Sequence, residues 1–122
     1  MDDGGGKEFR EAWIEGVRRH YPGQPKPGYI APWKEMPSWE QESAAAVHRQ
    51  VVAFLVATGG RAASLSRAQK GQFVAVCWAG QVYRHFPDSK PSYVAGWVDL
   101  PGWQQETDAD IFEQIERRLA AA

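Results

Sequence analysis

Two Arg-His pairs carry the side chains with the most evident binding chemistry. Arg19-His20 and Arg84-His85 repeat at a spacing of 65 residues in a chain of 122 residues. A guanidinium group can grip a phosphate or a carboxylate with two parallel hydrogen bonds. The pairs therefore predict a symmetric anion site. The alternative is that these cations cap carbonyl groups and complement the dipole at the C-terminal ends of two helices.

Four aromatic residues stand at matched places in two Pro-containing segments, 23–35 and 88–99. They are Tyr29, Trp33, Tyr93 and Trp97. If a two-fold axis relates the segments, the rings could line one composite groove in which a flat ligand stacks. The alternative is that the rings fold each segment back onto the helices as an ordered lid.

Other titratable residues indicate no catalytic or metal chemistry. The sequence has no zinc-type ligand spacing, no nucleophile elbow and no Gly-rich phosphate loop. We therefore expect no enzyme activity, no metal and no cofactor. His48 stands alone and is expected to pack or to face solvent. An acidic series near the C-terminus is interpreted as a solvated helix face: Asp108, Asp110, Glu113 and Glu116.

Charge and composition limit the classes of partner. The net charge is −1, so nucleic acid is unlikely, because affinity for phosphates usually needs a basic surplus. The single cysteine, Cys77, suits a reducing compartment. Residues 1–6 lack the profile of a secretory signal, and no apolar stretch approaches the roughly 20 residues of a membrane span. We expect a soluble cytoplasmic protein that does not enter a membrane.

The chain has the pattern of a tandem duplication. A shift of 65 residues, which becomes 64 after a one-residue deletion in the second connecting segment, aligns the two halves. All six tryptophans then form three matched pairs: Trp13 with Trp78, Trp33 with Trp97, and Trp39 with Trp103. Four of them fall in step with apolar helical stripes and are expected in the core: Trp13, Trp39, Trp78 and Trp103.

Apolar residues at spacings of four predict two helices in each half. The stripes are Phe9, Trp13 and Val17 with Val74, Trp78 and Val82, and then Val47, Val51 and Leu55 with Ile111, Ile115 and Leu119. The predicted fold is therefore all-α, with duplicated helix–loop–helix units. It has four main helices, pseudo-two-fold symmetry and ordered Pro/Trp-rich connecting loops.

Local signals set the predicted boundaries. Residues 1–6 form a flexible N-terminus, 7–58 the first repeat, 59–65 a linker and 66–122 the second repeat, all within one compact domain. The first helix of each copy should end near His20-Tyr21-Pro22 or His85-Phe86-Pro87, where a proline stops it. The second should begin at Pro37 or Pro101. A stop is expected at Gly59-Gly60, and Ser66 with Gln69 predicts a capping box.

The segment 73–79 is apolar nearly all round, unlike its counterpart in the first copy. A helix that is apolar on every side is expected to be buried on every side. We therefore expect the third helix to pack against both copies. The alternative is that it forms a homodimer interface.

The second half of each copy resembles a known family. YIAPWKEMPSWEQE, residues 29–42, and YVAGWVDLPGWQQE, residues 93–106, resemble the ryanodine receptor repeat. The resemblance covers about 14 residues per copy, and Gly96 replaces the proline that the family has before the loop aromatic. It implies a tandem module of bacterial type with approximate two-fold symmetry, which senses a ligand or binds a protein and is not an enzyme.

These observations predict a small non-catalytic binding or regulatory module. Its ligand is a small anion, such as a nucleotide-type signal, or a protein segment at the repeat interface. Arg84→Ala is expected to weaken that binding with little loss of stability. The alternatives are a homodimeric interaction scaffold built on the third helix and, ranked last, a nucleic-acid-associated factor of mobile-element or defence origin.

Overall fold

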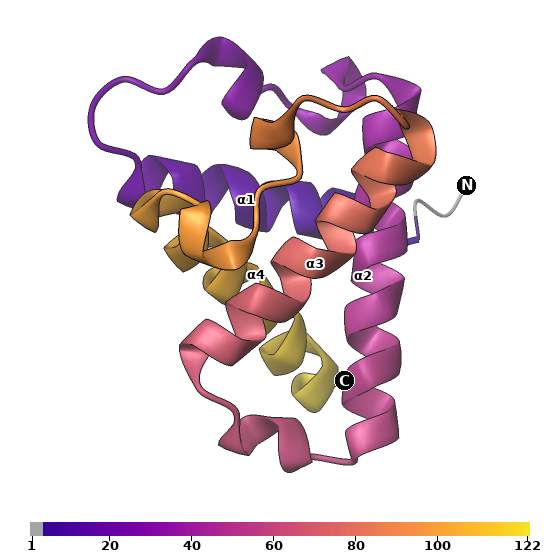
Figure 1. The fold of residues 1–122 in the computed structure, drawn as a ribbon. Coiled ribbons are helices and arrows are strands. Elements are labelled where there is room, and N and C mark those ends of the chain that lie inside the picture. Colours follow the sequence, from indigo (N-terminus) through magenta and orange to yellow (C-terminus); the bar gives the residue numbers. More distant parts are fainter. Residues whose placement is uncertain (1–3) are drawn as a thin grey trace.

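Four α-helices make up the computed structural model, which describes residues 4–122. They are α1 (Gly6–His20), α2 (Ser38–Thr58), α3 (Arg67–His85) and α4 (Gly102–Ala121). Within these residues there is no strand, so the all-α prediction is confirmed. Figure 1 shows the connecting segments 21–37 and 86–101, purple and orange, in the upper half of the view.

The helix ends follow the local signals closely. α1 ends at His20 and α3 ends at His85, as predicted, because a proline follows two residues later. α2 and α4 begin one residue after the expected positions. Pro37 and Pro101 have extended backbone, with ψ of 155° and 151°, and serve as N-caps whose carbonyls accept the first helical hydrogen bonds.

The linker between the halves is ordered by its caps. Gly59 adopts the left-handed conformation, with φ of 52°, and ends α2 as predicted. Ser66 and Gln69 form the predicted capping box at the start of α3. A 3-10 turn at Arg61–Ser64 within the linker was not predicted. The predicted flexible N-terminus includes residues 1–3, which lie outside the described residues, whereas Gly6 is already the first residue of α1.

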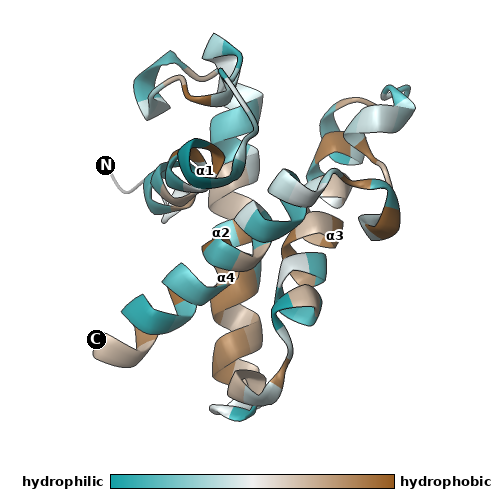
Figure 2. Cartoon of the chain, turned by 90° about the vertical axis from the view of Figure 1, so that its left-hand side faces the viewer, coloured by the Kyte–Doolittle hydropathy of each residue, from teal (hydrophilic) through white to brown (hydrophobic). Residues whose placement is uncertain are grey.

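One hydrophobic core joins the two halves. α1 and α3 each pack against both α2 and α4. Figure 2 shows the apolar C-terminal half of α2 in brown and the largely polar α1 in teal. The buried residues of this core are Phe9, Ala12, Ala44, Val47, Val51, Leu55, Ala62, Val74, Ile111, Phe112 and Ile115. The predicted stripes are therefore buried, apart from Trp13 and Trp78, which are partly buried, and Leu119, which is exposed near the end of α4.

The prediction that the third helix is buried on every side is wrong for this chain. α3 packs against α2 and α4, but Val76 is 66% exposed and Tyr83 is 54% exposed. Two neighbouring helices cover only part of a helix surface, so the remaining side of α3 faces solvent. Its proposed role in a homodimer stays a prediction.

The two connecting segments have the same local conformation. Each contains two 3-10 turns, Pro27–Tyr29 and Trp33–Glu35 in the first and Pro91–Tyr93 and Trp97–Asp99 in the second. Pro32 and Gly96 have nearly identical backbone angles, with φ of −66° in both. A glutamine at the matching place of the following helix also holds each segment. Gln41 Nε2 donates to Trp33 O at 2.7 Å, and Gln105 Nε2 donates to Trp97 O at 2.8 Å.

Candidate functional site

A cavity of about 460 Å³ lies where the two connecting segments meet the helices. This volume falls within the range of small-molecule sites, which is roughly 300–1,000 Å³. The lining comes from all four helices and from both connecting segments. Its aromatic members are Phe9, Trp13, Tyr21, Tyr29, Trp39, Trp78, Tyr93 and Trp103. The cavity is therefore a composite of the two halves of the chain.

The rings form two clusters, and each cluster joins the two halves. In the first, the Trp103 ring of α4 lies 5.8 Å from the Trp13 ring, 5.0 Å from Tyr21 and 5.6 Å from Tyr29. In the second, the Trp39 ring of α2 lies 6.3 Å from Trp78. These tryptophans were expected in the core. All four are partly buried and line the cavity, and Trp13 and Trp78 also pack against the hydrophobic core, as predicted.

The predicted loop aromatics separate into two groups. Tyr29 and Tyr93 line the cavity, as the stacking hypothesis requires. Trp33 and Trp97 are not among its lining residues, because they lie against the starts of α1 and α3. A Cβ at Gly6 would lie 2.6 Å from Trp33 Cη2, and a Cβ at Gly71 would lie 2.6 Å from Trp97 Cη2. The lid interpretation therefore describes these two tryptophans.

Arg10 is a buried cation in the cavity wall that the sequence analysis missed. It is 5% exposed, and its guanidinium donates to Ala31 O and Gly28 O at 3.0 Å each. It also lies 3.6 Å from Glu40 Oε2. Burial lowers the pKa of Arg10 and raises the pKa of Glu40, and the attraction between them only partly offsets these shifts. Arg10 thus anchors the first connecting segment to α1.

The second half of the chain has no equivalent of this pair. Under the repeat alignment, Arg10 corresponds to Ala75 and Glu40 corresponds to Gln104, and both of these residues line the cavity. The signal that could have identified Arg10 is its place beside Phe9 in the amphipathic stripe of α1. A charged residue on a packed helix face needs partners, and here they are two loop carbonyls and a carboxylate.

Asp108 is a second buried residue of the cavity wall, and it corrects the prediction of a solvated acidic face. Asp108 is only 5% exposed and lines the cavity from α4. Burial raises the pKa of Asp108 well above its usual range. The repeat alignment held the signal, since Asp108 matches Ala44, which is fully buried on α2.

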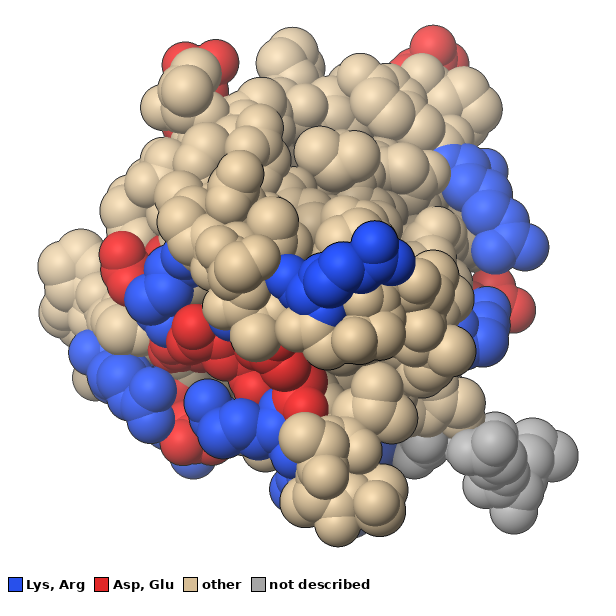
Figure 3. Space-filling view, turned by 90° about the horizontal axis from the view of Figure 1, so that it is seen from below, with Lys and Arg blue, Asp and Glu red and all other residues tan. Residues whose placement is uncertain are grey.

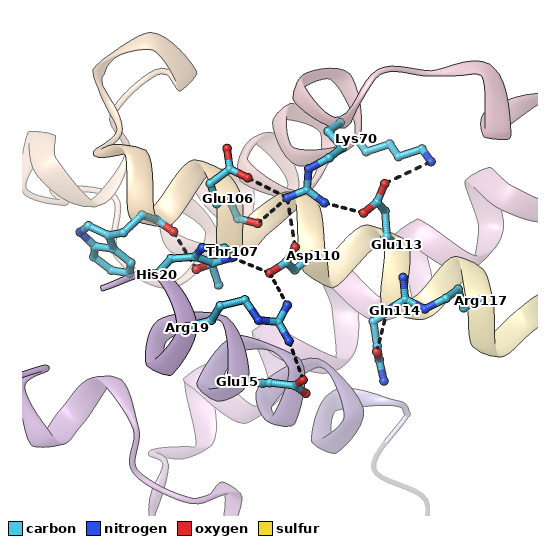
Figure 4. A network of polar contacts seen from close by, with 12 residues as sticks. Glu15, Arg19, His20, Lys70, Glu106, Thr107, Asp110, Glu113, Gln114 and Arg117 are labelled. Carbon is cyan, nitrogen blue, oxygen red and sulfur yellow. Dashed lines mark hydrogen bonds and ion pairs between the residues drawn. The ribbon is translucent and has the colours of Figure 1, made fainter. Parts of the chain in front are cut away.

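The rest of the acidic series is held in ion pairs, so the solvated-face prediction fails there for a different reason. Arg67 of α3 lies within 3.0 Å of Glu106, Asp110 and Glu113, and Lys70 pairs with Glu116 at 2.9 Å. These pairs join α3 to α4, and Figure 4 shows Lys70 of α3 with Glu106, Asp110 and Glu113 of α4 in this network. Figure 3 shows one face of the molecule on which carboxylates are bordered by Lys and Arg side chains, so that face does not carry a single sign of charge.

Arg19 and His20, the first predicted anion-binding pair, belong to this network. His20 Nε2 lies 2.8 Å from Asp110 Oδ2, and Arg19 pairs with the same oxygen at 3.3 Å and with Glu15 at 3.0 Å. Burial alone would raise the pKa of Asp110, but the bonds from His20 and Arg67 outweigh it and lower the pKa. Both side chains are already bound to carboxylates, as Figure 4 shows.

Arg84 and His85, the second predicted pair, lie elsewhere. In Figure 1 the C-terminal end of α1 is on the left and that of α3 is at the upper right. Arg84 is exposed, and His85 Nε2 is 3.9 Å from Glu42 and has no hydrogen-bond partner within the described residues. The structure therefore does not bring the two Arg-His pairs together into one site.

A smaller cavity of about 260 Å³ borders the ion-pair network. Three arginines line it together with carboxylates: Arg19, Arg67 and Arg117 with Glu15, Asp110 and Glu113. Arg19 and Arg67 are paired with these carboxylates, and Arg117 donates to Gln114 at 3.2 Å. An anion entering this cavity would have to displace existing ion pairs, so the larger cavity is the better candidate site.

Residues 4–122 contain neither a cluster of metal-binding side chains nor a helix suited to cross a membrane. No group of three or more His, Cys, Asp or Glu side chains in this range could hold a metal ion. His48, which was expected to pack or to face solvent, is half-buried and bonds to Glu8 at 3.1 Å. None of the helices in the described range combines the length and apolar character that a bilayer crossing requires.

Comparison with known proteins adds no relative. No family model, no curated protein and no solved structure matches the chain. The resemblance of residues 29–42 and 93–106 to the ryanodine receptor repeat therefore stays a prediction.

Proposed function

We propose that this protein is a binding module whose ligand occupies the composite cavity between the two connecting segments. The observation that carries the proposal is the cavity itself, with eight aromatic residues in its lining drawn from both halves of the chain. Aromatic walls with a few polar groups are typical of sites that bind small organic molecules. The resemblance to the ryanodine receptor repeat agrees with such a role, because that family comprises ligand-sensing and interaction modules.

The polar groups of the cavity support binding better than catalysis. Arg10 and Glu40 are paired with each other, which leaves Asp108 as the lining carboxylate without an ion pair. Catalysis by side chains usually combines a nucleophile or acid with a second group in hydrogen-bond reach. A binding role needs no such pair. We therefore propose a module that recognises its ligand without altering it.

We also propose that the two halves are copies of one unit. The pairing of six tryptophans is matched by equal backbone angles at Pro32 and Gly96 and by equivalent bonds from Gln41 and Gln105. On this view, the cavity lies at the interface between the copies. It became asymmetric when one copy acquired an Arg–Glu pair and the other a buried aspartate.

The proposal is tested by filling the cavity from α3. Ala79 lines the cavity, whereas Gln72 is exposed on the same helix, so Ala79→Met and Gln72→Met form a matched pair. Four tryptophans border the cavity, so tryptophan fluorescence can detect an occupant. We expect cationic, neutral or anionic aromatic fragments to shift the emission of the wild type and of Gln72→Met, and to bind more weakly to Ala79→Met. Equal binding to all three proteins would refute the site.

The same screen separates the cavity from the anion site expected from the sequence. Arg84 is exposed and is not among the cavity's lining residues. If Arg84→Ala weakens binding and Ala79→Met does not, the ligand binds at the Arg-His pair. If Ala79→Met weakens binding and Arg84→Ala does not, the ligand occupies the cavity, which is the result we expect.

A second candidate function is a homodimeric scaffold, because α3 leaves apolar side chains in solvent. Val76 and Tyr83 are two turns apart on that helix, and Phe86 beyond them is 43% exposed. Exposed apolar groups clustered on one surface mark interaction sites in many proteins. This function predicts a dimer in light scattering that Val76→Glu dissociates. A wild-type protein that stays monomeric as its concentration rises would exclude it.

A further inference from the structure

The strongest unexplained feature of the cavity is the carboxyl group of Asp108. Asp108 is 95% buried and lines the cavity from α4. Within residues 4–122, no side chain forms an ion pair or a hydrogen bond with it. Burying a charge without a partner is costly, so a carboxyl group in this position favours its protonated form until a cation pairs with it.

The neighbouring cation does not serve as that partner. Arg10 is the lining residue that carries a positive charge, and its guanidinium is held by two loop carbonyls and by Glu40. Burial is the cause of the raised pKa of Asp108, with no opposing contribution from Arg10. When Asp108 is ionised, the lining therefore carries one uncompensated negative charge.

The walls around this carboxyl group also favour positive charge. The faces of tryptophan and tyrosine rings are electrostatically negative, and they attract ammonium groups, including quaternary ones, that lie within about 6 Å of the ring centre. Lys26 and Lys90 already use this attraction at the outer side, where they lie 5.8 Å and 5.9 Å from the ring centroids of Tyr29 and Tyr93. Inside the cavity the rings of Trp13, Trp39, Trp78 and Trp103 are partly exposed.

We propose that the cavity binds a small organic cation, a protonated or quaternary amine with an apolar body, whose charge pairs with Asp108 and whose body packs against the tryptophan rings. This inference rests on the proposed function, since it names the class of ligand for the same cavity. It differs from the anionic ligand expected from the sequence, because the cations of that expectation do not line this cavity.

Binding of such a cation is coupled to a proton. The cation pairs with the ionised carboxylate, so Asp108 must lose its proton when the ligand enters, and a raised pKa makes that loss harder at low pH. Affinity for the cation therefore rises with pH until Asp108 is ionised in the free protein. The other titratable groups that line the cavity are Arg10, Tyr21, Tyr29, Glu40 and Tyr93.

The test uses three probes of similar body and different charge: benzyltrimethylammonium, benzyl alcohol and phenylphosphonate. Each is titrated into the wild type, into Asp108→Asn and into the control Asp88→Asn, whose carboxylate is exposed in the second connecting segment. Binding is followed by tryptophan fluorescence and calorimetry between pH 5 and 8. The ammonium probe does not titrate, so a change of its affinity with pH reports on the protein.

We expect the ammonium probe to bind most tightly, with an affinity that rises with pH. We expect Asp108→Asn to weaken its binding by at least about tenfold, the scale of a desolvated charge pair, and to leave benzyl alcohol unaffected. Asp88→Asn should bind as the wild type does. The pH dependence in the wild type needs no variant, so the inference stays testable if Asp108→Asn folds poorly.

The outcomes separate the two proposals. If benzyl alcohol or phenylphosphonate binds as tightly as the ammonium probe, and Ala79→Met blocks them, the cavity is a binding site and the cationic ligand is refuted. The cationic ligand is also refuted if Asp108→Asn binds the ammonium probe as tightly as the wild type does. If none of the three probes binds, both the proposed function and this inference fail.

Discussion

Gly71 offers the sharpest test of how α3, α4 and the second connecting segment pack together. A Cβ at this position would lie 2.6 Å from Trp97 Cη2, 3.1 Å from Ala109 N and 3.2 Å from Gln105 O. Gly80 on the same helix has no such neighbour within 4 Å. Neither residue has a positive φ, so alanine is compatible with both backbones. The pair Gly71→Ala and Gly80→Ala therefore separates helix propensity from packing.

The magnitudes follow from two opposing effects. Replacing a glycine inside a helix by alanine stabilises the helix by about 0.5–1 kcal/mol. Nothing opposes this gain at Gly80, so Gly80→Ala should raise the free energy of unfolding by that amount. At Gly71 the methyl group meets the backbone of α4 as well as a ring, and overpacking of this kind costs about 1–3 kcal/mol. We expect Gly71→Ala to lower the free energy of unfolding by about 1–2 kcal/mol.

Urea denaturation followed by circular dichroism measures both variants against the wild type. Gly6→Ala in the first copy should behave like Gly71→Ala, because its Cβ would lie 2.6 Å from Trp33 Cη2 and 3.0 Å from Ala45 N. The reasoning is refuted if Gly71→Ala stabilises the protein as much as Gly80→Ala does. That result would mean that Trp97 does not lie against the start of α3.

Three further predictions concern charged residues. Burial raises the pKa of Asp108 in the fold, so its contribution to stability is fully present below the unfolded pKa of about 3.9 and is lost as the pH rises through the folded pKa. The free energy of unfolding of the wild type minus that of Asp108→Asn should therefore fall with increasing pH. A difference that stays constant with pH in urea titrations would contradict this prediction. Arg10→Ala leaves Glu40 without its partner and should lower the free energy of unfolding by about 3 kcal/mol. Adding Glu40→Gln should restore part of this lost stability. Additive losses in a double-mutant cycle would show that the two side chains do not interact. Arg67→Ala should lower the free energy of unfolding by about 1 kcal/mol at low salt and by less at 1 M salt, because salt screens this partly exposed network of ion pairs. A loss of stability that does not depend on salt would argue against the ion pairs.

Sequence reasoning located the helices well because their limits depend on neighbouring residues. The ends of α1 and α3 at His20 and His85 follow from prolines two residues later, and the start of α3 follows from the Ser66 capping box. It treated Tyr29, Tyr93, Trp33 and Trp97 alike, as the lining of one stacking groove or as parts of two lids, whereas only the two tyrosines line the cavity. It could not separate these pairs, since which ring points inward depends on glycines some 26 residues earlier, at Gly6 and Gly71.

Local sequence patterns also failed to predict the burial of two charged residues in the cavity wall, Asp108 and Arg10. Asp108 follows an acidic residue and a threonine, and its local composition indicates a solvated surface. The alignment of Asp108 with Ala44, which is buried, indicated a buried position instead. Only a second helix packed over Asp108 can remove its carboxylate from water. Arg10 likewise has the charge of a surface residue, and it is buried because the first connecting segment folds back and presents two carbonyls to it.

The sequence by itself therefore determined the elements of this protein: four helices and most of their limits, which rest on periodicity and on local backbone preferences. Only the tertiary structure decided that the Arg-His pairs lie apart, that Arg19 and His20 are bound to Asp110, and that eight aromatic residues surround a cavity beside Asp108. The physical reason is that a binding site is made of surfaces from segments far apart in the chain. The position and burial of each such surface depend on packing, which no local pattern records.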